Sequence, residues 1–505
     1  MKQNLVVVGG GTAGWLTALL LKRSLQCDVT VIASSEIGTI GVGEGTTPQF
    51  LDAMAYLDIS LEKLVSETGC TLKSGIKFTN WNSDGTSYFH QFAPAPSLAH
   101  GNYTNFSWVE SDTNISLLAA LGQYGCADKA HMNWLLAEDG KIAITPANDL
   151  VNVSLWSAFG VHFDANQISK LLQDTAVERG VHHIDGDVVS TVLDDNNYIT
   201  GIVLNDGRVV DSDFVFDCSG FARVVINTLQ NTWVPCSHRL PANTAVAFRT
   251  PSTDVLPPYT TATAMRNGWL WNIPLQHTTG NGYVFSSEFT SVEAVVSELR
   301  DSGISIDNYR VINFDTGYLS EPWVNNCVAI GLASGFVEPL EATSIWTTIN
   351  SVARLTVSQT PLRDAGPKTR DYYNLKCVRH YECIIDFIEL HYYTNRNDTP
   401  FWKSRSLSPH TLNLLELWSE RVPAYEDVVS PTISMESQLI VAVGTGVLSP
   451  HVFEKELDHH PRRSDIMDTL SAMRTEYRLL SSDSYYHRQL IELMKERALW
   501  HTMPL

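Results

Sequence analysis

The sequence predicts an α/β fold that opens with a β-α-β unit, continues through a β-rich middle and ends in a mainly helical region. An apolar run at residues 4–8 passes through a glycine-rich turn into an apolar helical pattern and then a second strand at 27–34. Strand-like segments separated by turn residues recur between residues 181 and 315, and long helical patterns dominate from residue 370. With 505 residues, the chain is long enough for a large two-part enzyme.

The first turn reads GGGTAG and carries Gly9, Gly11 and Gly14 in the spacing G-x-G-x-x-G. These glycines permit a tight turn, close approach of the backbone to a pyrophosphate, and close helix–strand packing, while the helix N-terminus attracts phosphate. Because the motif lies in a β-α-β frame, it predicts a Rossmann-like dinucleotide site. An acidic residue often follows the second strand and binds the ribose; here Ser34 and Glu36 both stay open as candidates.

The rest of the chain divides into further strands and a helical end. A second glycine-rich loop at 38–48 either lies against a flat ring or only connects two elements. The segment DFVFDCSGF follows a β-meander and is typical of the return strand of a two-part flavoprotein, and residues 326–355 are predicted to form strand, loop and helix. The stretch 358–371 is the most linker-like. We therefore expect a module at 1–357, with Rossmann-like elements interleaved with a substrate-side sheet, and a mainly helical, substrate-covering region at 358–505.

The stretch GWLWNIPL at 268–275 contains two tryptophans separated by one residue. A strand would place Trp269 and Trp271 on the same face, because side chains alternate across a strand. Pro274 cannot donate to a ladder, so the strand should end there or meet a sheet edge. Without information from the rest of the chain, packing in a hydrophobic core is a sufficient explanation for this tryptophan pair.

Composition excludes several classes of protein. The formal net charge of −20 argues against nucleic acid or an anionic membrane as a partner, and we interpret it as a source of solubility. The N-terminal apolar run is short and enters a glycine turn, so it is predicted to be a strand and not a signal peptide. Eight cysteines without a C-x-x-C pair favour free thiols and a cytoplasmic location. The Asp-His-His run at 458–460 is expected to be a solvated polar loop, and no metal site is predicted.

Seven motifs occur along the chain in one order: GGGTAGW, GVGEGTTP, LKSGIKFTNW, HFDA, DCSGF, GWLWNIP and FVEPLEATSI. In this order they resemble the flavin-dependent halogenases of the tryptophan-halogenase type, over most of the chain. The glycine motif is shared by many flavoproteins, whereas Trp-x-Trp-x-Ile-Pro, the lysine of TLKSGIKF and EPLE are far more specific. The resemblance implies a flavoprotein monooxygenase-type fold that binds FAD. It also implies a reaction in which FADH2 and oxygen form a flavin hydroperoxide, halide attacks it, and hypohalous acid moves through a tunnel to an aromatic substrate.

The resemblance implies two catalytic residues. Lys73, which we expect on an early helical segment, matches the family's lysine and would donate a hydrogen bond to hypohalous acid. Forming a haloamine instead would require its pKa to fall considerably from the ordinary value of about 10.4. Glu341, the second glutamate of EPLE, matches the glutamate that stabilises the cationic ring intermediate and accepts its proton. Lys77 and Glu338 are the competing, weaker candidates.

The resemblance also implies where halide and cofactor bind. Halide is expected at Thr343 and Ser344, where free backbone N–H groups at a helix start form an anion site. The family usually reads EST-G where this chain reads EATS, so Ala342 and Ser344 depart from it and the halide preference stays open, with bromide expected. The residues that the resemblance assigns to FAD are Gly9, Gly10, Gly11, Thr12, Ala13, Gly14, Ser34, Ile37, Thr39, Glu44, Gly45, Val188, Leu332 and Ile345.

On the substrate side, YFHQF at 88–92 resembles the family's His-x-Phe element, so His90 and Phe92 would flank an aromatic ring; both are also plausible core residues. Trp269 and Trp271 would keep substrate away from the flavin and keep the tunnel dry. In tryptophan-specific members, a lid supplies paired tyrosines and an acid, but the comparable stretch 435–448 has no aromatic pair. We therefore expect an indole-like or phenol-like substrate, or a larger tethered one.

Two other functions compete with halogenation. A flavin-dependent aromatic hydroxylase would need no halide, but such enzymes commonly carry their own NAD(P)H site, and this chain shows one dinucleotide motif. That favours a separate NAD(P)H-dependent flavin reductase as the source of FADH2. A non-catalytic flavoprotein is the second alternative, and the presence of Lys73 and Glu341 argues against it. Oligomeric state, including a homodimer, stays open.

Overall fold

The computed structural model describes residues 3–25, 27–38, 43–92, 119–130, 132–142, 144, 159–423, 427, 429–430 and 432–502. The chain forms two compact units, each assembled from three separate stretches. Unit 1 comprises Met1–Cys70, Phe163–His238 and Phe314–Glu382. Unit 2 comprises Thr71–His162, Arg239–Asn313 and Cys383–Leu505. The expected functional division into 1–357 and 358–505 stays a prediction.

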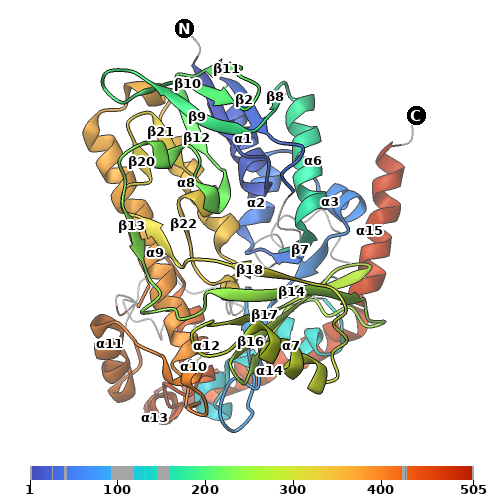
Figure 1. The fold of residues 1–505 in the computed structure, drawn as a ribbon. Helices are drawn as coiled ribbons and strands as arrows, with labels where there is room; N and C mark the ends of the chain where they lie inside the picture. Colours follow the sequence, from blue (N-terminus) through green and yellow to red (C-terminus); the bar gives the residue numbers. More distant parts are fainter. Residues whose placement is uncertain are drawn as a thin grey trace. The chain divides into compact units, whose positions relative to one another are not determined.

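Unit 1 is built on a six-stranded sheet whose core strands are parallel. In sheet order the strands are β20 (Trp323–Val324), β21 (Cys327–Ala329), β12 (Phe214–Asp217), β1 (Asn4–Val8), β2 (Asp28–Ala33) and β8 (His182–Asp185). The central β1 is buried on both faces, as a continuous run of apolar residues predicts for a parallel strand. Helix α1 (Thr12–Leu25) packs against α6 (Ala165–Glu178) and α8 (Ser344–Leu355), as can be followed in Figure 1. The β-α-β unit and the α/β fold are thus confirmed.

Smaller elements complete unit 1. Two three-stranded sheets occur, one with the order β11-β10-β9 and the other with the order β13-β19-β22. The bounds of these and the remaining unit 1 elements are β3 (Gly43–Gly45), α2 (Gln49–Tyr56), α3 (Leu61–Thr68), β9 (Val188–Leu193), β10 (Ile199–Leu204), β11 (Val209–Asp211), β13 (Trp233–Pro235), β19 (Gly317–Leu319) and β22 (Gly335–Phe336). The β-meander and its return strand β12 agree with the sequence prediction.

Unit 2 is built on a seven-stranded sheet that is antiparallel except where β15 pairs with β5. In order the strands are β18 (Tyr309–Asn313), β14 (Thr244–Pro251), β17 (Thr278–Phe285), β16 (Gly268–Pro274), β15 (Thr260–Met265), β5 (Gly75–Thr79) and β6 (Tyr88–Gln91). Helix α7 (Val292–Asp301) covers part of one face, where Val295 and Leu299 pack with Val246 and Leu270. A short pair, β4 (Thr71–Lys73) and β7 (Gly160–Asp164), runs antiparallel in the register Thr71↔His162.

The chain beyond residue 367 is mainly helical, as predicted. Helix α9 (Pro367–Tyr392) contributes residues to both units. The other helices of unit 2 are α5 (Met132–Ala137), α10 (Pro400–Lys403), α11 (Pro409–Glu420), α12 (Met435–Gly444), α13 (His451–His459), α14 (Arg463–Asp483) and α15 (His487–Thr502). Among the described helices, none is both long enough and apolar enough to cross a bilayer.

Several local predictions can be compared directly with the structure. Strand β16 ends at Pro274, as predicted, and none of the eight cysteines forms a disulfide in the structure. The expected polar loop at 458–460 is wrong, because α13 continues to His459. The expected linker at 358–371 is also partly wrong, because α9 already begins at Pro367, where proline suits a first helical turn. The described residues contain no group of three or more His, Cys, Asp or Glu side chains placed to hold a metal ion.

The indole of Trp271 lies directly over Gly282, its partner in the β16–β17 ladder. A Cβ at Gly282 would lie 2.0 Å from ring atom Cζ2, so Gly282→Ala should displace the indole and destabilise the fold by about 1–3 kcal/mol. Denaturant unfolding measures this loss. Gly366→Ala is the matched control, because a Cβ there meets no atom within 4 Å, and equal stability of both variants contradicts the prediction.

Candidate functional site

The turn between β1 and α1 forms a backbone cradle in unit 1. Gly9 has φ 123°, and a Cβ there would lie 2.3 Å from the Cys218 carbonyl oxygen. A Cβ at Gly14 would lie 1.9 Å from the Gly9 carbonyl oxygen, whereas a Cβ at Gly11 would meet no atom within 4 Å. Positions 9 and 14 therefore require glycine, and the open side at Gly11 leaves room for a pyrophosphate at the start of α1. These residues fit a dinucleotide cofactor.

The end of β2 contains the two candidates for ribose binding. The Ser34 hydroxyl accepts hydrogen bonds from the amides of Glu36 at 3.1 Å and Ile37 at 3.3 Å, so it stabilises the local turn. Ser35 donates to the Asp185 carboxylate through its amide and its hydroxyl, both at 2.8 Å, and these bonds lower the pKa of Asp185. Sequence reasoning missed Asp185, whose only signal was its place at the end of a strand, β8.

Glu44 on β3 and Asp164 at the end of β7 form an interacting pair of carboxyl groups in unit 1. Asp164 caps α6 by accepting from the amides of Asn166 at 2.9 Å and Gln167 at 3.2 Å. Burial, reinforced by the negative charge of Asp164, raises the pKa of Glu44 to about 7. A carboxyl group that titrates near neutrality is common at functional sites. Glu44 was predicted as a cofactor residue, whereas Asp164 lay inside the motif HFDA without being singled out, and their coupling was not predicted.

The other cofactor candidates lie on several unit 1 elements. A Cβ at Gly331 would lie 3.0 Å from the Ala13 methyl, so the 3-10 turn Gly331–Ala333, which holds Leu332, lies against the start of α1. The Thr12 and Ser169 hydroxyls are hydrogen-bonded at 3.2 Å. The remaining candidates are Gly10 in the turn, Gly45 on β3, Val188 on β9, the exposed Ile37 and the buried Ile345 on α8. Thr39 lies outside the described residues.

The segment EPLEATS forms a tight turn into α8. Glu338 and Glu341 are both buried, and Ala342 has φ 55°, an uncommon left-handed conformation for a residue other than glycine. Thr343 occupies the N-cap position and Ser344 is the first residue of α8, as predicted. No described residue accepts a hydrogen bond from either amide. The turn therefore presents two backbone donors at a positive helix end, which suits an anion.

Lys73 lies at the end of strand β4 in unit 2, so the expectation of an early helical segment is wrong. Its side chain is fully buried, with 0% of its surface exposed, and Nζ lies 4.8 Å from the centroid of the Phe92 ring. Lys77 differs, because it lies on β5, forms an ion pair with Glu138 at 3.1 Å and is partly exposed. Lysine is rarely fully buried unless it is paired, so the two candidates lie in very different environments, and the choice of Lys73 as the catalytic lysine stays a prediction.

An aromatic wall, defined here as His90, Phe92, Phe387, His391 and Tyr88, adjoins Lys73. The ring centroids of His90 and Phe92 are 6.3 Å apart in an edge arrangement, and those of His90 and Phe387 are 5.6 Å apart. His391 lies 5.1 Å from Phe387, centroid to centroid, and its Nδ1 is hydrogen-bonded to the Tyr88 hydroxyl at 2.7 Å. The two predicted residues, His90 and Phe92, are thus brought together with Lys73. Phe387 and His391 were missed, because a helix 300 residues away carries no motif that links it to β6.

The two tryptophans of β16 are buried neighbours with centroids 6.1 Å apart, so the shared face is confirmed. They differ in hydrogen bonding. Trp269 Nε1 donates to the Tyr392 hydroxyl at 2.7 Å, whereas Trp271 Nε1 is buried and has no hydrogen-bond partner among the described residues. Tyr392 therefore orients one indole through a hydrogen bond, whereas the other indole packs closely against Gly282.

Two buried histidines lie beside the strand of Lys73. His162 is on β7, and burial followed by the Lys73 charge and His487 lowers its pKa well below the ordinary range. Burial also lowers the pKa of His487 to about 4, and the Arg488 charge adds to this while hydrogen bonds to the Leu256 and Pro257 carbonyls oppose it. Both imidazoles are therefore neutral near pH 7. Sequence reasoning did not single out either residue.

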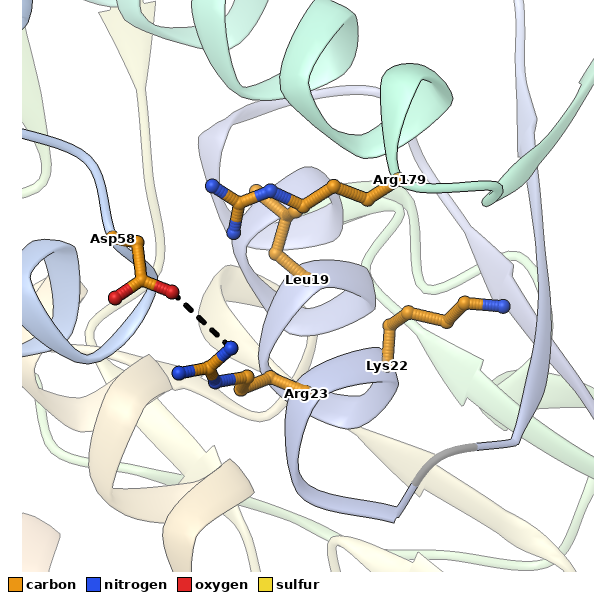
Figure 2. A pocket seen from close by; sticks show the side chains of 5 residues that line it. All are labelled: Leu19, Lys22, Arg23, Asp58 and Arg179. Atoms are coloured by element: carbon orange, nitrogen blue, oxygen red, sulfur yellow. Dashed lines mark ion pairs between the residues drawn. The ribbon is translucent and has the colours of Figure 1, made fainter.

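The stretch 435–448, expected to correspond to a lid, contains helix α12, in which Leu439 to Val443 are all buried apolar residues. One pocket lies elsewhere, at the C-terminal end of α1 in unit 1 (Figure 2). It is lined by Leu19, Lys22, Arg23, Asp58 and Arg179, with an Arg23–Asp58 ion pair of 3.1 Å. Since Lys22 lies ten residues beyond Thr12 on α1, this pocket is roughly 15 Å from the glycine turn along the helix and is separate from the cofactor cradle.

Comparisons with known proteins show which family the chain resembles. The sequence model of one family, described as tryptophan halogenase, matches residues 4–461. The chain is 31% identical to the tryptophan 6-halogenase SttH of Streptomyces toxytricini, with 88% of this chain and 90% of that protein covered. It is 31% identical to the tryptophan 7-halogenase RebH of Lentzea aerocolonigenes, with 84% and 81% covered.

Solved structures give the same result. The flavin-dependent halogenase Xcc4156 from Xanthomonas campestris is similar with a TM-score of 0.86 and 28% identity, with 98% of each chain covered. BrvH, a flavin-dependent halogenase from Brevundimonas sp. BAL3, is similar with a TM-score of 0.84 and 29% identity, with 98% of this chain and 99% of that chain covered. The similarity therefore extends over both units.

The depressed pKa of His487 makes stability depend on pH. The ordinary pKa of histidine is about 6.5, so below that pH this imidazole becomes protonated in the unfolded chain. In the folded chain it stays neutral until about pH 4. The stabilisation is fully present above pH 6.5 and is lost as pH falls towards 4, at up to about 1.4 kcal/mol per pH unit. Thermal unfolding at pH 7 and pH 5 should show a smaller acid loss for His487→Gln than for the unmodified chain. Equal acid losses contradict the prediction.

Proposed function

The chain belongs to the tryptophan halogenase family and is a flavin-dependent halogenase; from this premise we propose that it halogenates an aromatic, indole-like substrate with Lys73 directing the oxidant. The observation that carries the proposal is the fully buried Lys73 ammonium, 4.8 Å from the Phe92 ring centroid. A buried cation next to an aromatic face suits a polar oxidant that meets an aromatic ring.

The glycine turn is proposed to bind the pyrophosphate of FAD, used as FADH2, with Gly11 and the start of α1 facing the phosphates. Its close neighbours, the Gly331–Ala333 turn and the first turn of α8, supply further cofactor contacts through Leu332 and Ile345. When bound, FADH2 would supply the two electrons that activate oxygen, so that one oxygen atom could oxidise halide to hypohalous acid and the other would leave as water. The raised pKa of Glu44 allows this residue to hold or release a proton near neutral pH.

Halide is proposed to bind at the start of α8. The amides of Thr343 and Ser344 are donors without acceptors among the described residues, and the left-handed Ala342 sets their direction. Because the donors belong to the backbone, the departure from the family's sequence at 342 and 344 leaves them in place. The Ser344 hydroxyl is an additional polar group at this turn.

Lys73 and Glu341 are proposed to have separate roles in the electrophilic substitution of the aromatic ring. The Lys73 ammonium donates a hydrogen bond to the oxygen of hypohalous acid and makes the halogen more electrophilic; as the ring takes the halogen, the oxygen–halogen bond breaks and the hydroxide leaves as water. The Glu341 carboxylate stabilises the positive charge that develops on the ring and accepts its proton. Trp269 and Trp271 contribute a rigid apolar barrier that excludes water, because Tyr392 and Gly282 fix their rings.

The aromatic wall sets the proposed substrate class. His90 and Phe92 present ring faces and edges to an aromatic substrate, which favours indole-like or phenol-like rings, free or tethered. Helix α12 offers buried apolar side chains where tyrosines and an acid would be needed to bind an amino acid's charged groups. Free tryptophan is therefore expected to be a poorer substrate than indole. A separate NAD(P)H-dependent flavin reductase is proposed to supply FADH2.

Removal of the buried ammonium tests the role of Lys73. Lys73→Ala should lower halogenated product roughly 100-fold or more while FAD remains bound, because the oxidant loses its hydrogen-bond donor. Product is quantified by mass spectrometry with reductase, oxygen, bromide and indole present. Lys77→Ala is the matched control and should retain nearly full activity, since Lys77 is engaged with Glu138. Full product from Lys73→Ala shows that the assignment is wrong.

The halide preference can be measured directly. With equal concentrations of bromide and chloride, we expect the brominated product to predominate, because the less strongly hydrated bromide is easier to transfer from water to a buried amide site. The same product panel with indole, tryptophan and a phenol tests the substrate class. If a hydroxylated product forms without halide, the enzyme is a hydroxylase and the proposed halogenation is wrong. If the chlorinated product predominates, the expected bromide preference is wrong.

A further inference from the structure

The strand that carries Lys73 is held on one side by His162. The Thr71 hydroxyl donates to the Pro274 carbonyl at 2.6 Å, so it has no second proton to give and must accept from His162 Nδ1, which lies 3.2 Å away. His162 Nε2 then accepts from the Thr260 hydroxyl at 2.8 Å. One imidazole therefore connects β4 with β15 and, through Thr71, with the end of β16. All of these side chains are buried.

A second imidazole holds the same strand from another side. The Leu72 amide donates to His487 Nε2 at 3.0 Å, so Nδ1 carries the proton and donates to the Leu256 carbonyl at 3.2 Å. One residue beyond Lys73, the Ser74 amide and hydroxyl both donate to the Pro258 carbonyl at 2.7 Å. Polar contacts thus fix Thr71, Leu72 and Ser74, the residues on both sides of Lys73.

We propose that His162 and His487 are positioning residues which clamp strand β4 so that the Lys73 ammonium is held in its productive place. This inference rests on the proposed function of Lys73. It adds His162, which lies in the motif HFDA but was given no role there, and His487, which lies in none of the motifs. His162 acts through Thr71 and His487 acts through the Leu72 amide.

Two features separate this clamp from ordinary core packing. Thr71 and Lys73 project from the same face of β4, because side chains alternate along a strand, so the imidazole bonded to Thr71 lies on the face from which Lys73 extends. Apolar side chains could fill the same volume without the cost of burying imidazoles beside an ammonium. Hydrogen bonds, unlike apolar contacts, also fix direction, which a donor that must aim at a small oxidant requires.

Two pairs of variants test the clamp. Thr71→Val removes the hydroxyl with little change of shape, and Thr71→Ser keeps it. His487→Leu removes the acceptor for the Leu72 amide, and His487→Gln retains an acceptor at the far end of the side chain. If His487→Leu fails to fold, the nearly isosteric Thr71 pair still tests the proposal.

The first readout is the fate of the oxidant. In Thr71→Val and His487→Leu, the rate of FADH2 oxidation should stay within about twofold of that of the unmodified enzyme. The amount of halogenated indole formed per flavin oxidised should fall roughly 10- to 100-fold, as expected for a misplaced catalytic group. Hypohalous acid trapped by an added halogen acceptor should rise in compensation. Thr71→Ser and His487→Gln should recover most of the product. Unchanged product yield, or an equal fall in flavin oxidation and product, overturns the proposal.

The second readout is independent of halogenation. The Lys73 amine is fully buried, so it should resist reductive methylation, whereas the partly exposed Lys77 serves as an internal standard. Thr71→Val and His487→Leu should raise methylation of Lys73 relative to Lys77, and the two conservative variants should not. Absence of halogenated product from the unmodified enzyme would refute the proposed function, whereas unaltered methylation of Lys73 in both disruptive variants would refute the clamp.

Discussion

The structure around Lys73 depends on one constraint, the burial of its ammonium group. Transfer of a lysine charge out of water is costly, and a fold accepts this cost only with compensating contacts. In unit 2 those contacts include the face of Phe92 and a strand fixed by backbone and side-chain hydrogen bonds on each side of Lys73. Neutral histidines suit this environment, because a second cation beside the ammonium would be strongly unfavourable.

The two units contain complementary kinds of chemistry. Unit 1 presents backbone amides at two helix starts, the glycine turn and the turn before α8, and both suit anions. Unit 2 presents a buried cation, an aromatic wall and a rigid tryptophan pair. Each unit is assembled from three stretches of chain, so residues that share a chemical task come from segments that alternate along the sequence.

Some parts of the site could be predicted because short motifs encode them. Gly9 and Gly14 have neighbours that leave no space for a Cβ, and the same requirement makes the G-x-G-x-x-G spacing recognisable. Thr343 and Ser344 were predicted at a helix start because the position where α8 begins depends on neighbouring residues in the sequence, not on distant contacts. Phe387, His391 and His487 lie in no motif, and the motif that contains His162 does not indicate its partner, since all four residues contact side chains or backbone groups far away in the sequence. Lys73 was predicted as a residue but placed on the wrong kind of element, because three residues of strand are too few to show a period.

The sequence by itself determined the β-α-β start, the period of the strands, and the shared face of Trp269 and Trp271. These features depend on the backbone preferences of residues a few positions apart. Only the tertiary structure decided that Lys73 is fully buried against Phe92, that Tyr392 binds one indole and Gly282 lies under the other, and that two neutral histidines hold β4. Burial and hydrogen-bond partners arise from long-range packing, and no local pattern in the chain specifies which distant side chains will meet.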